Sequence, residues 1–238
     1  MPIKLREPIS AITHLASAAA ALAGVLFLFH LTQQHSLPAQ VGGGLRQLIQ
    51  ANSGSAAAAY AFLAIGVYGA SLFLMFLASG VYHSVIASAR VIQVLRKVDH
   101  SAIYLLIAGS YTPFCLLAFR GFWQWGFLAI IWGLALVGII SKLFFIHAPR
   151  WFTAGVYVVM GWLSLFAVRE MLAVLPAGAT FWLGLGGVIY TLGAVVYVTK
   201  KLDFIPGRFG FHEIWHLFVM GGAAAHFLAI ARLIEAAV

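Results

Sequence analysis

The sequence predicts an all-α integral membrane protein: a seven-transmembrane helix bundle, N-terminus cytoplasmic and C-terminus outside, forming one domain over residues 1–238. Of the 238 residues, 63% are hydrophobic and only 8% are charged, whereas a soluble domain carries about 25% charged residues. The mean hydropathy is +1.00. The charges gather in short clusters, and the apolar stretches between them are long enough to cross a bilayer, which takes roughly 20 residues.

The clusters of charge divide the chain into seven apolar segments. We expect spans near residues 10–31, 57–84, 100–119, 122–142, 151–169, 178–199 and 212–233. The first is interpreted as a membrane helix and not a signal peptide, because Glu7 and Pro8 interrupt its basic start. The polar connection that follows contains a possible interfacial helix at residues 45–50. The start of the second span is the least defined boundary, because no charge occurs from Gln47 to Ala89.

The basic residues indicate the orientation. Seven spans place ten of the 14 Lys and Arg residues on the N-terminal side and four on the other. The positive-inside rule therefore puts the N-terminus in the cytoplasm. Arg90, Arg96 and Lys97 are expected in the loop between the second and third spans, with no role beyond topology. The net charge of +8 follows from such basic loops and does not indicate nucleic-acid binding. Cys115, the single cysteine, excludes an intrachain disulfide and is expected to be buried.

The start of the last span reads His212-Glu213-Ile214-Trp215-His216. Residues four apart on a helix point the same way, so the two imidazoles can bind one metal ion. Zinc is the usual metal of such a pair, because it accepts neutral nitrogen ligands in a four-coordinate shell.

Further polar residues are expected at the same membrane level, near the cytoplasmic face. Four helices contribute the set Glu7, Ser10, His14, His83, Asp99, His100, His212, Glu213 and His216. Intramembrane ionisable groups are costly and usually mark function, and His with carboxylate is a metal-binding combination. Alternatively, the negative charge of Glu7 could serve only to interact favourably with the dipole at the start of its helix. His226 lies roughly 20 Å deeper than His212 on the same helix, too far to share a metal.

These residues also carry a resemblance to the hemolysin III family, the bacterial branch of the progestin and adipoQ receptor (PAQR) family. The matching pieces are Glu7-x-x-Ser10-x-x-x-His14, Ser79-Gly80-Val81-Tyr82-His83, Asp99-His100 with Ile107-Ala108-Gly109-Ser110-Tyr111-Thr112-Pro113, and His212-Glu213-Ile214-Trp215-His216 with Gly221 and His226-Phe227. The resemblance implies zinc (Zn2+) near the cytoplasmic face, in a multi-pass protein of the bacterial cytoplasmic (inner) membrane. It implies the metal ligands His83, His212 and His216. It also implies that Asp99 approaches the metal through water and that Ser79 lies beside it. Eukaryotic relatives usually have Asn where this chain has Ser10.

Three His ligands leave one zinc position open, which is typical of catalytic zinc. The expected function is therefore metal-dependent hydrolysis of a lipid amide or ester, with Asp99 as general base and Ser79 as hydrogen-bond donor. The resemblance points the same way, since relatives are linked to ceramide-type hydrolysis. The partner would be a membrane lipid; the oligomeric state stays open. The alternatives are a membrane sensor or regulator with a structural zinc, a pore-forming cytolysin, and a zincin-type protease with Glu213 as base.

Overall fold

The structure, a computed structural model, describes residues 5–36, 54–205 and 209–236. The elements are α1 (Pro8–Ser36), α3 (Gly54–Ser84), α4 (Ala89–Leu117), α5 (Gly121–Phe144), α6 (Arg150–Trp162), η1 (Leu163–Ala167), α7 (Val168–Val174), α8 (Ala177–Thr199) and α9 (Phe211–Ala236). Within the described ranges, seven helical stretches are long and apolar enough to cross a membrane, judged by length and composition. The predicted seven-helix bundle therefore has its expected helices.

Two predicted boundaries were wrong. The third helix begins at Ala89 and not near residue 100. Arg90, Arg96 and Lys97 therefore lie on its first turns and not in a loop, and Asp99 lies in the third turn instead of at the helix entrance. Hydropathy marks only the apolar part of a helix, whereas the backbone stays helical while long basic side chains extend toward water.

The fifth span is the second difference. It continues past residue 169 to Val174 as α6, the 3₁₀ turn η1 and α7. The hydroxyl of Tyr111 accepts a hydrogen bond from the backbone N–H of Ser164 at 2.9 Å and donates one to the carbonyl of Gly161 at 2.6 Å. It therefore provides hydrogen-bond partners for backbone groups where the α-helix changes to the 3₁₀ turn. The proposed interfacial helix at residues 45–50 lies outside the described residues.

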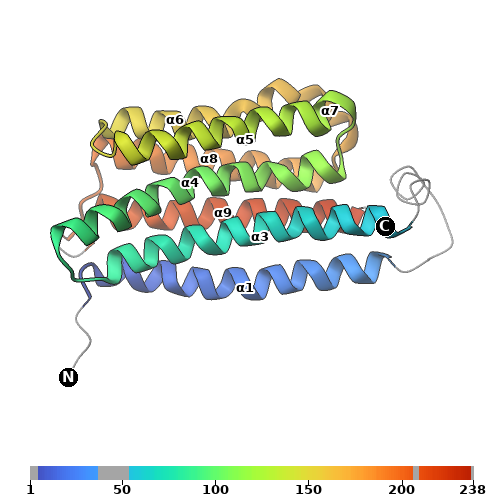
Figure 1. The fold of residues 1–238 in the computed structure, drawn as a ribbon. Coiled ribbons are helices and arrows are strands. Elements are labelled where there is room, and N and C mark those ends of the chain that lie inside the picture. Colours follow the sequence, from blue (N-terminus) through green and yellow to red (C-terminus); the bar gives the residue numbers. More distant parts are fainter. Residues whose placement is uncertain (1–4, 37–53, 206–208, 237–238) are drawn as a thin grey trace.

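The helices lie side by side along one common direction (Figure 1). α3 packs between α1 and α4, and α9 packs against α1, α4 and α8. α6 packs against α8 and α4, and α5 packs against α4. Small residues permit the closest approaches: a Cβ on Gly109 of α4 would lie 2.7 Å from the Ser71 Cβ of α3. Cys115 is fully buried in this core, as expected.

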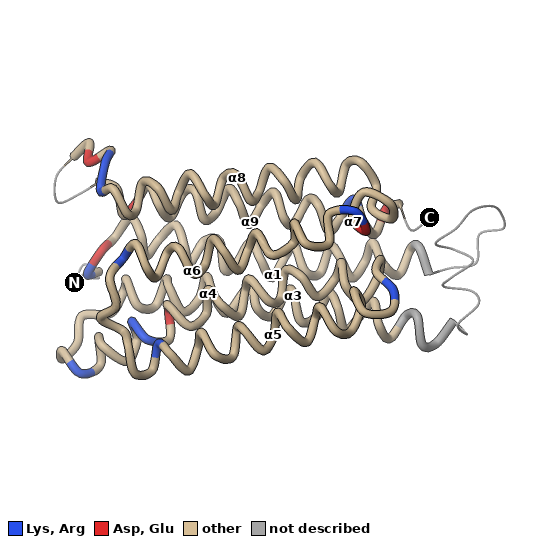
Figure 2. Tube along the Cα trace, turned by 90° about the horizontal axis from the view of Figure 1, so that it is seen from above, with Lys and Arg blue, Asp and Glu red and all other residues tan. Residues whose placement is uncertain are grey.

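Basic residues lie toward the two ends of the bundle (Figure 2). We call the end at which α1, α4, α6 and α9 begin the basic end. Its described Lys and Arg residues are Arg6, Arg90, Arg96, Lys97, Lys142, Arg150, Lys200 and Lys201. The opposite end has Arg120, Arg169 and Arg232 among the described residues. Because basic residues are more numerous at the basic end, the positive-inside rule predicts that this end faces the cytoplasm.

Candidate metal centre

Three histidines meet at the basic end. His83 comes from the last turn of α3, and His212 and His216 come from the first turns of α9. One potential ligand atom of each lies within 4.8 Å of the others. His83 and His216 are 1% and 3% exposed, so the surrounding helices exclude most water from this cluster. The expected ligand set is thus gathered in one place.

Glu7 orients His83. Its carboxylate Oε2 lies 2.6 Å from the Nδ1 of His83, and an ionised carboxylate only accepts, so Nδ1 carries the proton. The backbone holds the pair in place, because the Glu7 N–H donates to the His83 carbonyl at 3.0 Å and the Arg6 N–H to the Ser84 carbonyl at 3.3 Å. The hydrogen bond from His83 holds the pKa of Glu7 below its usual value. Nε2 of His83 is therefore left as the basic nitrogen that can bind a metal.

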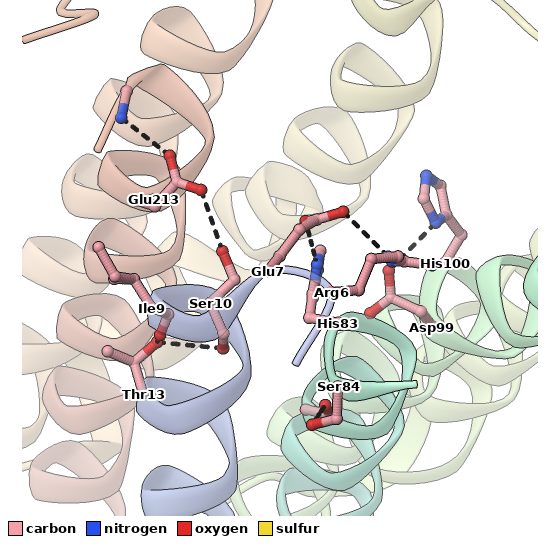
Figure 3. Close-up of polar contacts among 12 residues, drawn as sticks. Arg6, Glu7, Ile9, Ser10, Thr13, His83, Ser84, Asp99, His100 and Glu213 are labelled. Carbon is pink, nitrogen blue, oxygen red and sulfur yellow. Dashed lines mark hydrogen bonds and ion pairs between the residues drawn. The ribbon is translucent and has the colours of Figure 1, made fainter. Parts of the chain in front are cut away.

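Glu213, next to His212, has a different environment (Figure 3). Its Oε2 accepts the backbone N–H of Gly210 at 2.9 Å, and its Oε1 accepts the Ser10 hydroxyl at 3.3 Å. The first bond caps the start of α9, and the second fastens α1 to α9. Glu213 and Ser10 therefore hold α9, the helix that carries His212 and His216, against α1.

His14 lies directly against the cluster. Its ring stacks on that of His216, with centroids 3.8 Å apart and an interplanar angle of 23°, and it meets Phe76 edge-on. Both of its ring nitrogens are buried, and neither has a hydrogen-bond partner within standard geometry among the described residues. The expected proximity of His14 to the site is present, although it is not one of the three grouped ligands.

Asp99 and His100 of α4 approach from another side. Asp99 is 8% exposed, and its Oδ2 lies 3.3 Å from the Nδ1 of His100. Asp99 is close enough to His83 and Ser79 to interact with both. A buried carboxylate thus lies next to the histidine cluster.

A cavity of about 340 Å³ opens from this cluster into the bundle. His14, Ser79, Asp99, His212 and His216 line one end of it, and apolar side chains form most of its wall. His226, fourteen residues along α9 from His212, also lines it, so the cavity extends for roughly 20 Å along that helix. His226 contacts the Tyr190 ring edge-on at 5.3 Å and lies outside the ligand group, as its depth predicted.

Arg6 is a site residue that the sequence reasoning missed. Its Nε lies 3.2 Å from Glu7 Oε1, and its guanidinium lies 4.2 Å from the centroid of the Tyr82 ring. Arg6 therefore helps to hold the carboxylate that orients His83. Its position next to Glu7 in the sequence could have indicated this role, whereas its charge was used only to predict the orientation in the membrane.

The donor set fits a metal ion such as zinc. Three imidazoles converge, and the fixed proton on one of them leaves a free nitrogen there. The buried Nδ1 of His216 has no hydrogen-bond partner in the part of the chain that the structure describes, and buried polar atoms are rarely left in that state. These residues could hold Zn²⁺, although three imidazoles also suit other transition metals.

Comparisons with known proteins agree with one another. The family model described as "Haemolysin-III related" matches residues 3–227. The chain is 40% identical to "Hemolysin-3 homolog" of Bacillus subtilis over 183 residues, which are 77% of this chain and 81% of that protein. It is 43% identical to "Hemolysin-3" of Bacillus cereus over 172 residues, 72% and 75% of the two chains. It is 31% identical to human "Monocyte to macrophage differentiation factor" over 168 residues, 69% and 67% of the two chains.

Proposed function

The chain belongs to the hemolysin III family of multi-pass membrane proteins, and we propose that it is a zinc-dependent hydrolase of a lipid amide or ester. His83, His212 and His216 would hold the ion near the cytoplasmic face of the bacterial inner membrane. When bound, zinc would act as a Lewis acid and lower the pKa of water toward 7. The observation that carries the proposal is the cavity, where His212 and His216 of the three-histidine cluster, a buried carboxylate and a long apolar space meet.

Asp99 is the proposed general base. It is buried, it lines the cavity beside two of the histidines, and its contact with His100 keeps it oriented. Glu213 is less suited to this role, because both of its oxygens already accept hydrogen bonds from Gly210 and Ser10. This difference favours Asp99 over the zincin-type alternative.

Ser79 is the proposed hydrogen-bond donor to the oxygen on which charge develops. It lies one helical turn before His83 on α3, is 3% exposed, and faces the cavity near Asp99. A donor fixed by a helix in a largely apolar cavity stabilises such charge without reorganisation.

The shape of the cavity supports a lipid substrate. The scissile bond would lie at the polar end, between the histidines and Asp99, and an acyl chain would occupy the apolar remainder. An extended chain gains about 0.8 kcal/mol per buried CH₂ group, so the apolar wall would supply binding and the polar end the chemistry.

Hydrolysis of a fluorescent ceramide-like amide by the protein in lipid nanodiscs tests the proposal. Asp99→Asn should lower turnover by roughly 10² to 10⁴, the usual contribution of a general base, with zinc content unchanged. Asp203→Asn is the matched control, since Asp203 is an exposed acid at the same end, and it should keep full activity. A larger loss in Glu213→Gln than in Asp99→Asn would contradict the proposed roles.

A membrane sensor or regulator braced by structural zinc is the second candidate. The observation that favours it is that the ligands come from α3 and α9, so one ion would fasten the two helices. In that case the wild type would hydrolyse no lipid amide or ester, and removal of zinc would lower thermal stability without removing an activity.

A further inference from the structure

Lys142, in the last turn of α5, is a buried cation. It is 3% exposed, and its Nζ donates to the hydroxyl of Thr153 on α6 at 2.8 Å. In the part of the chain that the structure describes, no carboxylate forms an ion pair with it. A hydroxyl compensates little of the cost of burying an ammonium group, so this position favours a nearby anion.

Two arginines lie at the same end of the bundle as Lys142. Arg96 of α4 lies close enough to interact electrostatically with Lys142 and with Tyr197. Arg150 of α6 lies over the rings of Tyr197 and Phe211, 5.5 and 5.3 Å from their centroids. Neither arginine forms an ion pair among the described residues. Three helices thus each place at the basic end a cation that forms no ion pair among the described residues.

These cations neighbour residues that line the polar end of the cavity. Arg96 precedes Asp99 by three residues, and Arg150 precedes Thr153 by three residues. Residues three apart share a helix face with a rise of about 4.5 Å. Asp99, Thr153 and Tyr197 line the cavity. Arg96 and Arg150 therefore lie about one helical turn beyond Asp99 and Thr153, toward the basic end, and Lys142 contacts Thr153 directly.

Topology alone does not account for this arrangement. A charge that only orients the protein can stay in water, as Arg90 does on the exposed first turn of α4. Lys142 is instead buried against Thr153, and no described carboxylate forms an ion pair with it there.

We propose that Arg96, Lys142 and Arg150 bind the phosphate group of a lipid beside the polar end of the cavity. One arginine guanidinium can donate two parallel hydrogen bonds to two oxygens of a phosphate group, and the lysine ammonium adds a compact positive charge. This inference rests on the proposed function and names its substrate class: an amide or ester lipid with a phosphate-bearing headgroup. The phosphate would lie at headgroup level, and the acyl chain would pass the histidines into the cavity.

Calorimetric titration of the purified protein in detergent tests the proposal. The probes are dioctanoyl phosphatidic acid, dioctanoylglycerol (the same chains without phosphate) and inorganic phosphate. The phosphatidic acid should bind at least about 10-fold more tightly than either other probe. Lys142→Gln and Arg96→Gln should each weaken its binding about 10-fold, the range of a lost charged hydrogen bond. Arg90→Gln, the matched control on α4, should bind like the wild type.

Several results would overturn the inference. Unchanged binding in Lys142→Gln and Arg96→Gln would do so, as would an equal loss in Arg90→Gln. Inorganic phosphate binding as tightly as the lipid would exclude a lipid source. If Lys142→Gln does not fold, Arg96→Gln and Arg150→Gln carry the test. Binding is measured without turnover, so an inactive wild type that binds phosphatidic acid refutes only the hydrolase. Hydrolysis of neutral amides without phosphate selectivity refutes only this subsite.

Discussion

Replacement of Glu7 should weaken metal binding although Glu7 is not a proposed ligand. The contact between Glu7 Oε2 and His83 Nδ1 is 2.6 Å long, which is short for a charge-assisted bond. It fixes the ring and leaves Nε2 as the basic nitrogen. Glu7→Ala removes the acceptor, and Glu7→Gln keeps an oxygen that can accept the same proton but removes the charge. The backbone bond from the Glu7 N–H to the His83 carbonyl is available in both variants.

The magnitude follows from the surroundings of the pair. Loss of the carboxylate behind a metal-binding imidazole costs about 10- to 100-fold in metal affinity. The side chain of His83 is only 2% exposed, so water replaces the lost acceptor poorly, and Glu7→Ala should approach 100-fold, or about 2.7 kcal/mol. The side chain of Glu7 is 38% exposed, so solvent screens its charge, and Glu7→Gln should lose about 10-fold, or about 1.4 kcal/mol.

Zinc titration of the apoprotein against a competing chromophoric chelator measures this affinity. Glu170→Gln, an acid at the opposite end of the bundle, is the control and should bind like the wild type. Zinc affinities within about twofold of wild type for both Glu7 variants would refute the orienting role. A larger loss in Glu7→Gln than in Glu7→Ala would contradict the argument from charge and hydrogen bonding.

Two further predictions concern the bundle. A periplasmic activity reporter should be active when fused after Val238 and inactive when inserted after Ile86, between α3 and α4; the reverse pattern would invert the orientation. Gly109→Ala should destabilise the protein by about 1–3 kcal/mol, because its Cβ would lie 2.7 Å from Ser71 Cβ, whereas Gly133→Ala on α5 meets nothing within 4 Å. Thermal unfolding in detergent compares the two, and equal melting temperatures would argue against the close approach of α3 and α4.

Much of the fold could be predicted from hydropathy, because each span is an apolar stretch between charges. The extent of α4 could not, since its first turns carry Arg90, Arg96 and Lys97 and resemble a loop. The 3₁₀ turn at residues 163–167 was also missed. It depends on the hydroxyl of Tyr111, about 50 residues earlier in the chain, and local sequence does not encode such a contact.

The histidine cluster was predicted from the spacing of His212 and His216 and from the family resemblance. The functions of the neighbouring residues could be recognised only from the three-dimensional structure. Glu213 belongs to the same motif as these histidines, yet its oxygens accept hydrogen bonds from Ser10 and Gly210. The sequence places Lys142 in a loop, and only its low exposure and its hydrogen bond to Thr153 of α6 show that it is buried.

The zinc content of the purified protein tests the central claim most directly. Elemental analysis of the wild type in detergent should give about one zinc per chain, because three imidazoles converge on one point. The double variant His212→Ala/His216→Ala should hold almost none, and His226→Ala should match the wild type. A full complement of zinc in the double variant would contradict the assignment of His83, His212 and His216 as the metal ligands.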